Sequence, residues 1–152
     1  MDEIGRILAI DYGARRIGIA VSDPIRVTAQ SLPTIAAKGL QKILSELETI
    51  IDEKQVTEIV VGMPLNLKGE MTAAAQKVEK FIHHLQNRFG LPVHSWDERW
   101  TSIAAQRTIW EFGKSPSRNK DKVDQISAML ILQSFLDHLN FKNQQAKQDS
   151  KE

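Results

Sequence analysis

The chain contains no cysteine, little net charge and no long apolar run, and each absence excludes a class of protein. Without cysteine it has no disulfides and no thiolate metal ligands. Twenty basic against nineteen acidic side chains leave a net charge of +1, so any attraction for nucleic acid has to be local. The longest apolar run near the C-terminal end, residues 128–132, is far too short to span a membrane.

The residues that are present indicate an ordinary intracellular domain. The 152 residues, 41% of them hydrophobic, are enough for one domain with a buried core. The segment MDEIGR lacks the basic and apolar regions of a signal peptide, and the lack of cysteine agrees with a reducing cytosol. We therefore expect a cytoplasmic monomer or homodimer with no membrane partner. Residues 1–141 should form a single domain, and residues 142–152 a polar, disordered tail.

The spacing of apolar residues predicts an α/β fold. Three strand-like segments joined by short links predict an antiparallel meander at the N-terminal end, and segments with helical spacing alternate with strands after it. The predicted strands are 6–11, 17–22, 28–35, 58–63 and 93–96, and the predicted helices are 40–54, 72–89, 101–112 and 121–141. The first, fourth and fifth strands should be parallel because helices connect them. The result is a mixed five-stranded sheet with helices on both faces.

Acidic residues occupy three positions at which apolar elements begin or end. Asp11 ends the first predicted strand, Asp97 and Glu98 follow the fifth, and Asp124 lies in the first turn of an otherwise apolar helix. Parallel strands end at one edge of a sheet, so Asp11 and Glu98 should converge there. The small side chains one turn after Asp124 would let that helix lie close to the sheet and bring Asp124 toward Asp11.

Carboxylates brought together at neutral pH repel one another unless one is protonated or a cation lies between them. Oxygen ligands without cysteine or clustered histidine suit Mg²⁺ or Mn²⁺ rather than zinc. Two such ions can activate a water molecule and stabilise the leaving oxygen of a phosphodiester. We therefore predict that Asp11, Glu98 and Asp124 are catalytic and bind two ions. Alternatively, Asp11 caps a turn and Asp124 is an acid favoured by the helix dipole.

A cluster of basic residues lies directly before Asp124. Lys114, Arg118, Lys120 and Lys122 fall within ten residues, and residues 113–120 are predicted to form a mobile loop. A basic loop beside a metal site suits a phosphate backbone, although a solvated linker can have the same composition. The other basic residues that could extend this surface are Arg15, Arg16, Lys68 and Arg99.

The chain resembles the YqgF-type family, whose members are described as Holliday junction resolvases or pre-16S rRNA nucleases. The resemblance covers nearly all of residues 4–140 and is carried by AIDYGARRIGIAVSD, VVGMPLNLKGE, DERWTS and NKDKVDQISAMLIL. It implies a ribonuclease H-like fold and metal-dependent phosphodiester hydrolysis. The acids of its three motifs map onto Asp11, Glu98 and Asp124, with Asp97 and Asp121 as further candidate ligands. Its glycines and its proline-containing loop map onto Gly13, Gly18, Gly62, Pro64 and Gly69.

The resemblance favours an endo- or exonuclease that processes the 5′ end of pre-16S rRNA, with an RNA precursor as its partner. Resolution of branched, four-way DNA remains open, as does a non-catalytic role in ribosome assembly. A sugar-kinase-like ATP-binding domain also carries an aspartate and glycines on its first hairpin. That fold needs two such domains, and this chain has neither a P-loop nor a GxGxxG motif. In the nuclease interpretation Asp11 is a metal ligand, and Arg15 and Arg16 face the substrate or solvent.

Overall fold

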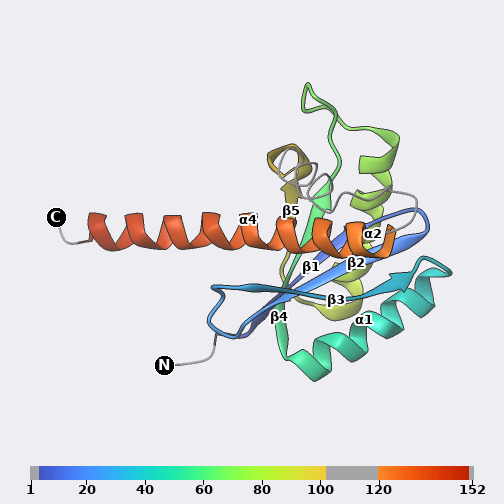
Figure 1. Ribbon diagram of the computed structural model, residues 1–152, viewed down its shortest axis with the longest axis horizontal. Helices are drawn as coiled ribbons and strands as arrows, with labels where there is room; N and C mark the ends of the chain where they lie inside the picture. The colour runs from blue at the N-terminus through green and yellow to red at the C-terminus, as the bar shows by residue number, and fades with distance from the viewer. Residues whose placement is uncertain (1–3, 102–119, 151–152) are drawn as a thin grey trace.

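The chain folds into a sheet with helices on both faces, and the computed structural model describes residues 4–101 and 120–150 (Figure 1). The strands are β1 (Arg6–Tyr12), β2 (Arg16–Ser22), β3 (Ala29–Ala36), β4 (Val56–Met63) and β5 (Val93–Asp97). The helices are α1 (Leu40–Lys54), α2 (Ala73–Phe89), the 3-10 helix η1 (Glu98–Trp100) and α4 (Lys120–Asp149).

Within the described residues the sheet has the order β3-β2-β1-β4-β5. β2 pairs antiparallel with both β1 and β3, which confirms the predicted meander. β1, β4 and β5 are parallel, as expected for strands connected through helices. The predicted mixed sheet is therefore confirmed, and the carboxyl ends of its three parallel strands lie at one edge.

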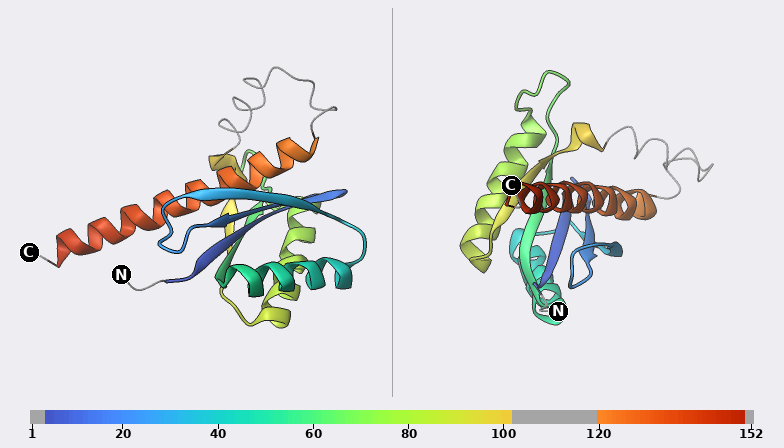
Figure 2. Two further views of the ribbon diagram at one scale, coloured as in Figure 1. Left: turned by 60° about the horizontal axis from the view of Figure 1, so that its bottom comes forward. Right: turned by 90° about the vertical axis from the view of Figure 1, so that its left-hand side faces the viewer.

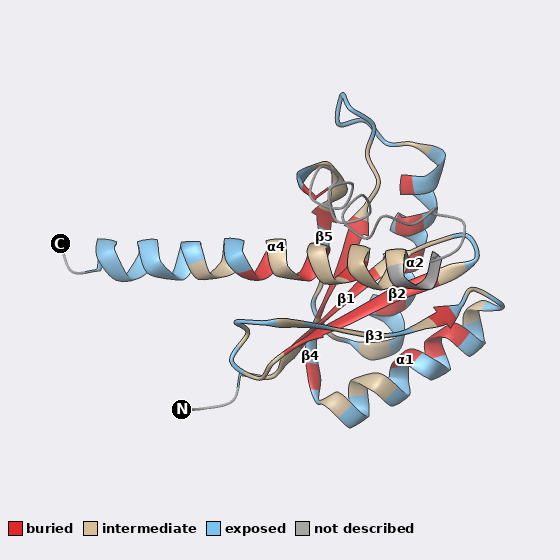
Figure 3. Ribbon diagram, in the orientation of Figure 1, coloured by how far each residue is buried: buried red, intermediate tan, exposed pale blue. Residues whose placement is uncertain are grey.

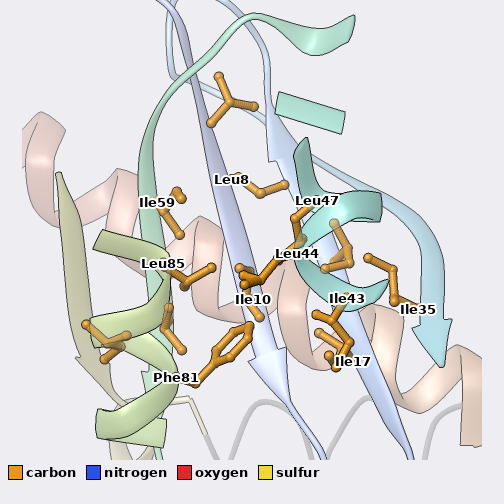
Figure 4. Close-up of a cluster of buried hydrophobic side chains, with 14 of the residues drawn as sticks. Leu8, Ile10, Ile17, Ile35, Ile43, Leu44, Leu47, Ile59, Phe81 and Leu85 are labelled. Carbon is orange, nitrogen blue, oxygen red and sulfur yellow. The ribbon is translucent and has the colours of Figure 1, made fainter. Parts of the chain in front are cut away.

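Side chains that alternate between the two faces of the strands create two separate cores. The larger core lies under α1 and α2, and the smaller core lies under α4 on the opposite face (Figure 2, left). Residues labelled in the close-up of the larger core are Leu8, Ile10, Ile17, Ile35, Ile43, Leu44, Leu47, Ile59, Phe81 and Leu85 (Figure 4). The smaller core consists of Ile7, Ala9, Ala20, Val60, Trp96, Ala128, Ile131, Leu132, Phe135 and Leu136.

α2 illustrates why the helical segments form where the apolar spacing predicts them. Its buried residues recur at intervals of three and four, so they fall on the single stripe that packs on the sheet. Thr72 caps the first turn, since its hydroxyl accepts a hydrogen bond from the backbone N of Ala75 at 3.1 Å. Gly90 ends the helix in the left-handed conformation with φ of 65°.

α4 is longer than the sequence pattern predicts. The expected end at Phe141 is wrong, because the helix continues to Asp149 and includes most of the segment predicted to be a disordered tail. Buried residues anchor α4 to the sheet between Ala128 and Leu136, whereas its last turns are exposed and project beyond the sheet (Figures 1 and 3). Among the described residues, no helix combines the length and apolar character needed to cross a membrane.

The observed boundaries of other elements differ less from the predicted ones. β4 begins at Val56 rather than at residue 58, and η1 was not predicted. Apart from its first residue, the helix predicted over 101–112 lies outside the described residues. So does the predicted loop 113–120, except that Lys120 already belongs to α4.

Candidate functional site

Asp11 stands at the end of β1, on the sheet face that α4 covers. Ile7 and Ala9 precede it on this face and are fully buried in the smaller core. Asp11 pairs with Gly18 of the antiparallel β2, and β1 is parallel to β4 on its other side. Because side chains alternate between the two faces of the strand, the Asp11 side chain lies on the α4 face, at the edge where the parallel strands end.

Glu98 begins η1 directly after β5 and extends over the same face. Thr101 closes this turn, because its backbone N and its Oγ1 each donate to the carbonyl oxygen of Glu98 at 3.0 Å. Gly62 of β4 lies beneath the side chain. A Cβ at position 62 would stand 2.6 Å from both Glu98 Oε1 and Ile131 Cδ1. Glycine at this position thus leaves the space that the Glu98 side chain occupies.

The carboxyl groups of Asp11 and Glu98 are hydrogen-bonded to each other, and the pKa of each is raised. Burial, reinforced by the charge of Asp11, raises the pKa of Glu98 to about 8, and protonated Glu98 donates a hydrogen bond to Asp11. The pKa of Asp11 is also raised, chiefly by burial and further by the charge of Asp124, although the hydrogen bond from Glu98 opposes this rise. Near neutral pH the pair therefore carries one negative charge rather than two.

Asp124 comes from α4, whose backbone lies directly against β2. A Cβ at Gly18 would stand 2.2 Å from the carbonyl oxygen of Asp124, so glycine permits this close approach. The Asp124 side chain is bound by Arg16, whose Nε donates to Oδ2 at 3.0 Å, and each side chain is 29% exposed. Arg16 shares a strand face with Gly18, so it points under α4. The expectation that Arg16 faces substrate or solvent stays a prediction.

The three acids lie near one another without forming a three-ligand metal site. Asp11 and Glu98 contact each other, whereas Asp124 is paired with Arg16. Among the side chains that the structure describes, which do not include those of residues 102–122, no group of three histidine or acidic side chains is placed to hold a metal ion. α4 already contains Lys120, so Asp124 lies beyond the first helical turn in which it was predicted.

Asp97, the other acid of the DER motif, is bound to its neighbour Arg99. The Nε of Arg99 donates to Asp97 Oδ2 at 2.8 Å, and its backbone N donates to Oδ1 at 3.0 Å. These hydrogen bonds hold the pKa of Asp97 below its ordinary value. Arg99 also contacts the loop between β4 and α2, where Nη1 donates to the carbonyl oxygen of Leu67 at 3.4 Å and the guanidinium lies beside Gly69. Asp97 and Arg99 therefore act as one unit that joins η1 to this loop.

Comparison with known proteins decides the family. The family model described as "RuvX: Holliday junction resolvase" matches residues 5–138. This chain belongs to the RuvX family. A relative from Koribacter versatilis (strain Ellin345), named "Putative pre-16S rRNA nuclease", is 47% identical over 133 residues, which are 88% of this chain and 87% of that protein. A relative of the same name from Desulfitobacterium hafniense (strain DSM 10664 / DCB-2) is 41% identical over 143 residues, 94% and 99% of the two chains. The YqgF-type resemblance is thereby confirmed.

Solved structures are similar to the RuvX-family fold of this chain. "T. thermophilus RuvC in complex with Holliday junction substrate" has a TM-score of 0.54 at 12% identity, covering 84% of this chain and 91% of that one. "Crystal structure of the fowlpox virus Holliday junction resolvase" has a TM-score of 0.54 at 13% identity, covering 88% and 99%. At these identities the likeness concerns the fold alone, and it confirms the ribonuclease H-like architecture.

The remaining predicted contacts of this RuvX-family chain are exposed or lie outside the described residues. Arg15 is exposed in the turn between β1 and β2, and Lys68 is exposed in the loop between β4 and α2. The residues, or their side chains, that lie outside the described part are Lys114, Arg118, Lys120, Asp121 and Lys122. The roles of all these residues in binding nucleic acid or metal stay predictions.

Two features of the RuvX-family site escaped the sequence analysis. The first is the ion pair of Arg16 with Asp124, although the period of two that links positions 16, 18 and 20 of β2 could have indicated that Arg16 faces α4. The second is the steric role of Gly62. Its signal was a glycine inside an otherwise apolar strand, a pattern typical of close approach by another group.

The raised pKa of Glu98 predicts that the metal-free protein loses stability as the pH rises. The pKa of Glu98 is 4.5 in the unfolded chain and about 8 in the folded one. The folded state therefore holds more protons between these values, so the stabilisation is complete below pH 4.5 and is lost as the pH rises to about 8. Glu98→Gln keeps a neutral donor toward Asp11 and should flatten the decline.

Melting temperatures in chelator, from about pH 5 to about pH 8.5, measure this effect. Glu79→Gln, which neutralises an exposed acid on α2, is the matched control and should retain the wild-type decline. If Glu98→Gln and the wild-type protein declined in parallel, Glu98 would be ionised in the folded state and the raised pKa would be excluded.

Proposed function

We propose that the chain is a metal-dependent endo- or exonuclease that hydrolyses phosphodiester bonds in the cytoplasm and processes the 5′ end of pre-16S rRNA. The observation that carries this proposal is the Asp11–Glu98 pair, two hydrogen-bonded carboxyl groups brought together where the parallel strands β1 and β5 end, with burial raising the pKa of both. Strongly shifted acids with a specific charge partner cluster at functional sites. The name of the relatives, "Putative pre-16S rRNA nuclease", supports the same activity and suggests the substrate.

Divalent cations suit the chemistry of this site. Asp11, Glu98 and Asp124 supply carboxylate oxygens, which Mg²⁺ and Mn²⁺ prefer. A cation would replace the proton that compensates the repulsion between Asp11 and Glu98. We assign two ions to these three acids, with Asp97 and Asp121 as further candidate ligands. When bound, such ions activate a water molecule and stabilise the leaving oxygen of the phosphodiester.

The residues around the acids control when they are available. The space above Gly62 and the hydrogen bonds of Thr101 hold Glu98 over the sheet. Arg16 neutralises Asp124 in the absence of substrate. A substrate phosphate that competes for the guanidinium of Arg16 would release Asp124 to serve as a ligand, so that substrate binding completes the site. Arg15, Lys68 and the basic residues of segment 114–122 would bind phosphates farther along the strand.

A four-way DNA junction is the second candidate substrate, because the matching family model is described as a Holliday junction resolvase. A resolvase cuts two symmetry-related strands and therefore acts as a symmetric dimer. Processing of an RNA end needs no such symmetry. Both functions use the same acids and the same chemistry, so they differ in substrate binding alone.

Three labelled substrates incubated with Mg²⁺ or Mn²⁺ test the proposal: a 5′-extended 16S precursor, a four-way DNA junction and a plain single strand. We expect cleavage of the precursor, arrest by chelator and products with 5′-phosphate ends. Preferential cleavage of the junction would establish the resolvase instead. Precursor binding without cleavage, equal for the wild-type protein and Asp11→Asn, would indicate a non-catalytic assembly factor and contradict the nuclease proposal.

A further inference from the structure

Trp100 is an exposed aromatic side chain in the same short helix as Glu98. The residue is 63% exposed, although aromatic residues form only 6% of the chain. Among the described residues, Phe141 on the projecting end of α4 is the other exposed large aromatic residue. Trp100 therefore presents an exposed aromatic ring two residues from a candidate catalytic acid.

The ring of Trp100 packs against a second tryptophan, which limits its movement. It packs edge-on against Trp96, with 4.7 Å between the ring centroids and an interplanar angle of 75°. Trp96 is 7% exposed, and its Nε1 donates to the hydroxyl of Ser134 on α4 at 3.2 Å. Phe135 contacts Trp96 as well, with 5.5 Å between the ring centroids. The α4 core thus holds Trp96 in place, and Trp96 orients Trp100.

Two basic side chains lie near Trp100, one in η1 and one in the loop between β4 and α2. Arg99, which precedes Trp100, is tied to Asp97 and to the carbonyl oxygen of Leu67. Lys68 is exposed in that same loop. Supported aromatic rings beside positive charges are typical of surfaces that bind single-stranded nucleic acid, where bases stack on the rings and cations contact the phosphates.

We propose that Trp100 is a stacking platform for an unpaired nucleobase of the substrate, close to the phosphodiester bond that the Asp11–Glu98 pair would attack. This inference rests on the proposed nuclease function and narrows its substrate class. A base inside a continuous duplex already has neighbours on both faces and cannot offer one to Trp100. Trp100 therefore favours single-stranded RNA, such as an unpaired 5′ extension, over fully paired DNA.

Binding in chelator, where cleavage cannot proceed, separates this contact from the chemistry. The probes are a fluorescently labelled single-stranded RNA and a hairpin duplex of matching sequence. Trp100→Ala should weaken binding of the single strand about 5- to 150-fold, the range expected for one lost base–aromatic stack. Trp100→Phe should restore most of the affinity, and binding of the duplex should be unchanged. Phe141→Ala, which removes the other exposed aromatic ring, is the matched control and should bind like the wild-type protein.

Two further measurements distinguish stacking from a structural role. Trp100→Ala removes no charge, so the dependence of binding on salt concentration should keep its wild-type slope. An RNA with one abasic nucleotide at the contacted position should bind the wild-type protein weakly, and Trp100→Ala should then add no further loss.

Unchanged affinity of Trp100→Ala for the single strand would overturn the platform while the nuclease function could still stand. Equal losses for single strand and duplex would also overturn it. Failure of the wild-type protein to bind or cut any nucleic acid would instead refute the proposed function.

Discussion

Replacing Asp11 by asparagine is expected to abolish cleavage while leaving the metal-free protein as stable as the wild type, or slightly more stable. Asparagine has the shape of aspartate and can still hydrogen-bond, but it removes one of the negative charges gathered at this edge of the sheet. Loss of a group that stabilises charge in the transition state costs about 10²–10³-fold in rate or more. The measurements are the cleavage rate with Mn²⁺ and the melting temperature in chelator.

Asp23, which directly follows β2, provides a matched control for the same change. Its Oδ1 accepts hydrogen bonds from the backbone N of Val27 and of Thr28 at 2.7 Å each, so its role is to hold the turn between β2 and β3. Asp23→Asn should therefore melt at a lower temperature and still cut RNA. If Asp11→Asn behaved like Asp23→Asn, with a lower melting temperature and normal cleavage, Asp11 would be a structural residue and the nuclease proposal would lose its central acid.

Gly18→Ala is expected to lower the melting temperature by about 5–10 °C and to impair cleavage strongly. The obstacle is space rather than backbone conformation, because the added Cβ would stand 2.2 Å from the carbonyl oxygen of Asp124 and 2.9 Å from its carbonyl carbon. A helix backbone cannot rotate away as a side chain can, so α4 has to shift from β2. Asp124 would shift with it, and a displacement of about 1 Å at a reacting group can cost about 10²-fold in rate.

Gly90→Ala tests whether this loss is specific to the contact with α4. Gly90 has φ of 65°, so alanine there is strained, but no atom lies within 4 Å of the added Cβ. This variant should lose some stability and keep its activity. A Gly18→Ala protein that melted and cut like the wild type would show that α4 does not rest on β2 at this position, and the place of Asp124 beside Asp11 would be refuted.

Local pattern was sufficient for the elements that are half or fully buried. Short apolar runs predicted β1 and β2, which are buried on both faces, and helical spacing predicted α1 and α2, which bury a single stripe. The connections then limited the sheet to a meander followed by parallel strands, which is the order observed. The end of α4 could not be predicted in this way. Its exposed last turns have no apolar period, and only their continued hydrogen-bonded helix shows where it ends.

The sequence by itself determined that acids stand at the ends of strands on one sheet edge, since parallel strands and a period of two place Asp11 and Glu98 there. Only the tertiary structure decided the state of those acids. The proton that Glu98 keeps depends on burial beside Asp11, and the partner of Asp124 is Arg16, which lies 108 residues away in the chain. Such contacts depend on how closely α4 docks on β2, and that distance depends on the absence of a side chain at Gly18. The packing of α4 on the sheet sets the distances between groups that are far apart in the chain, and the local spacing of apolar residues does not predict such distances.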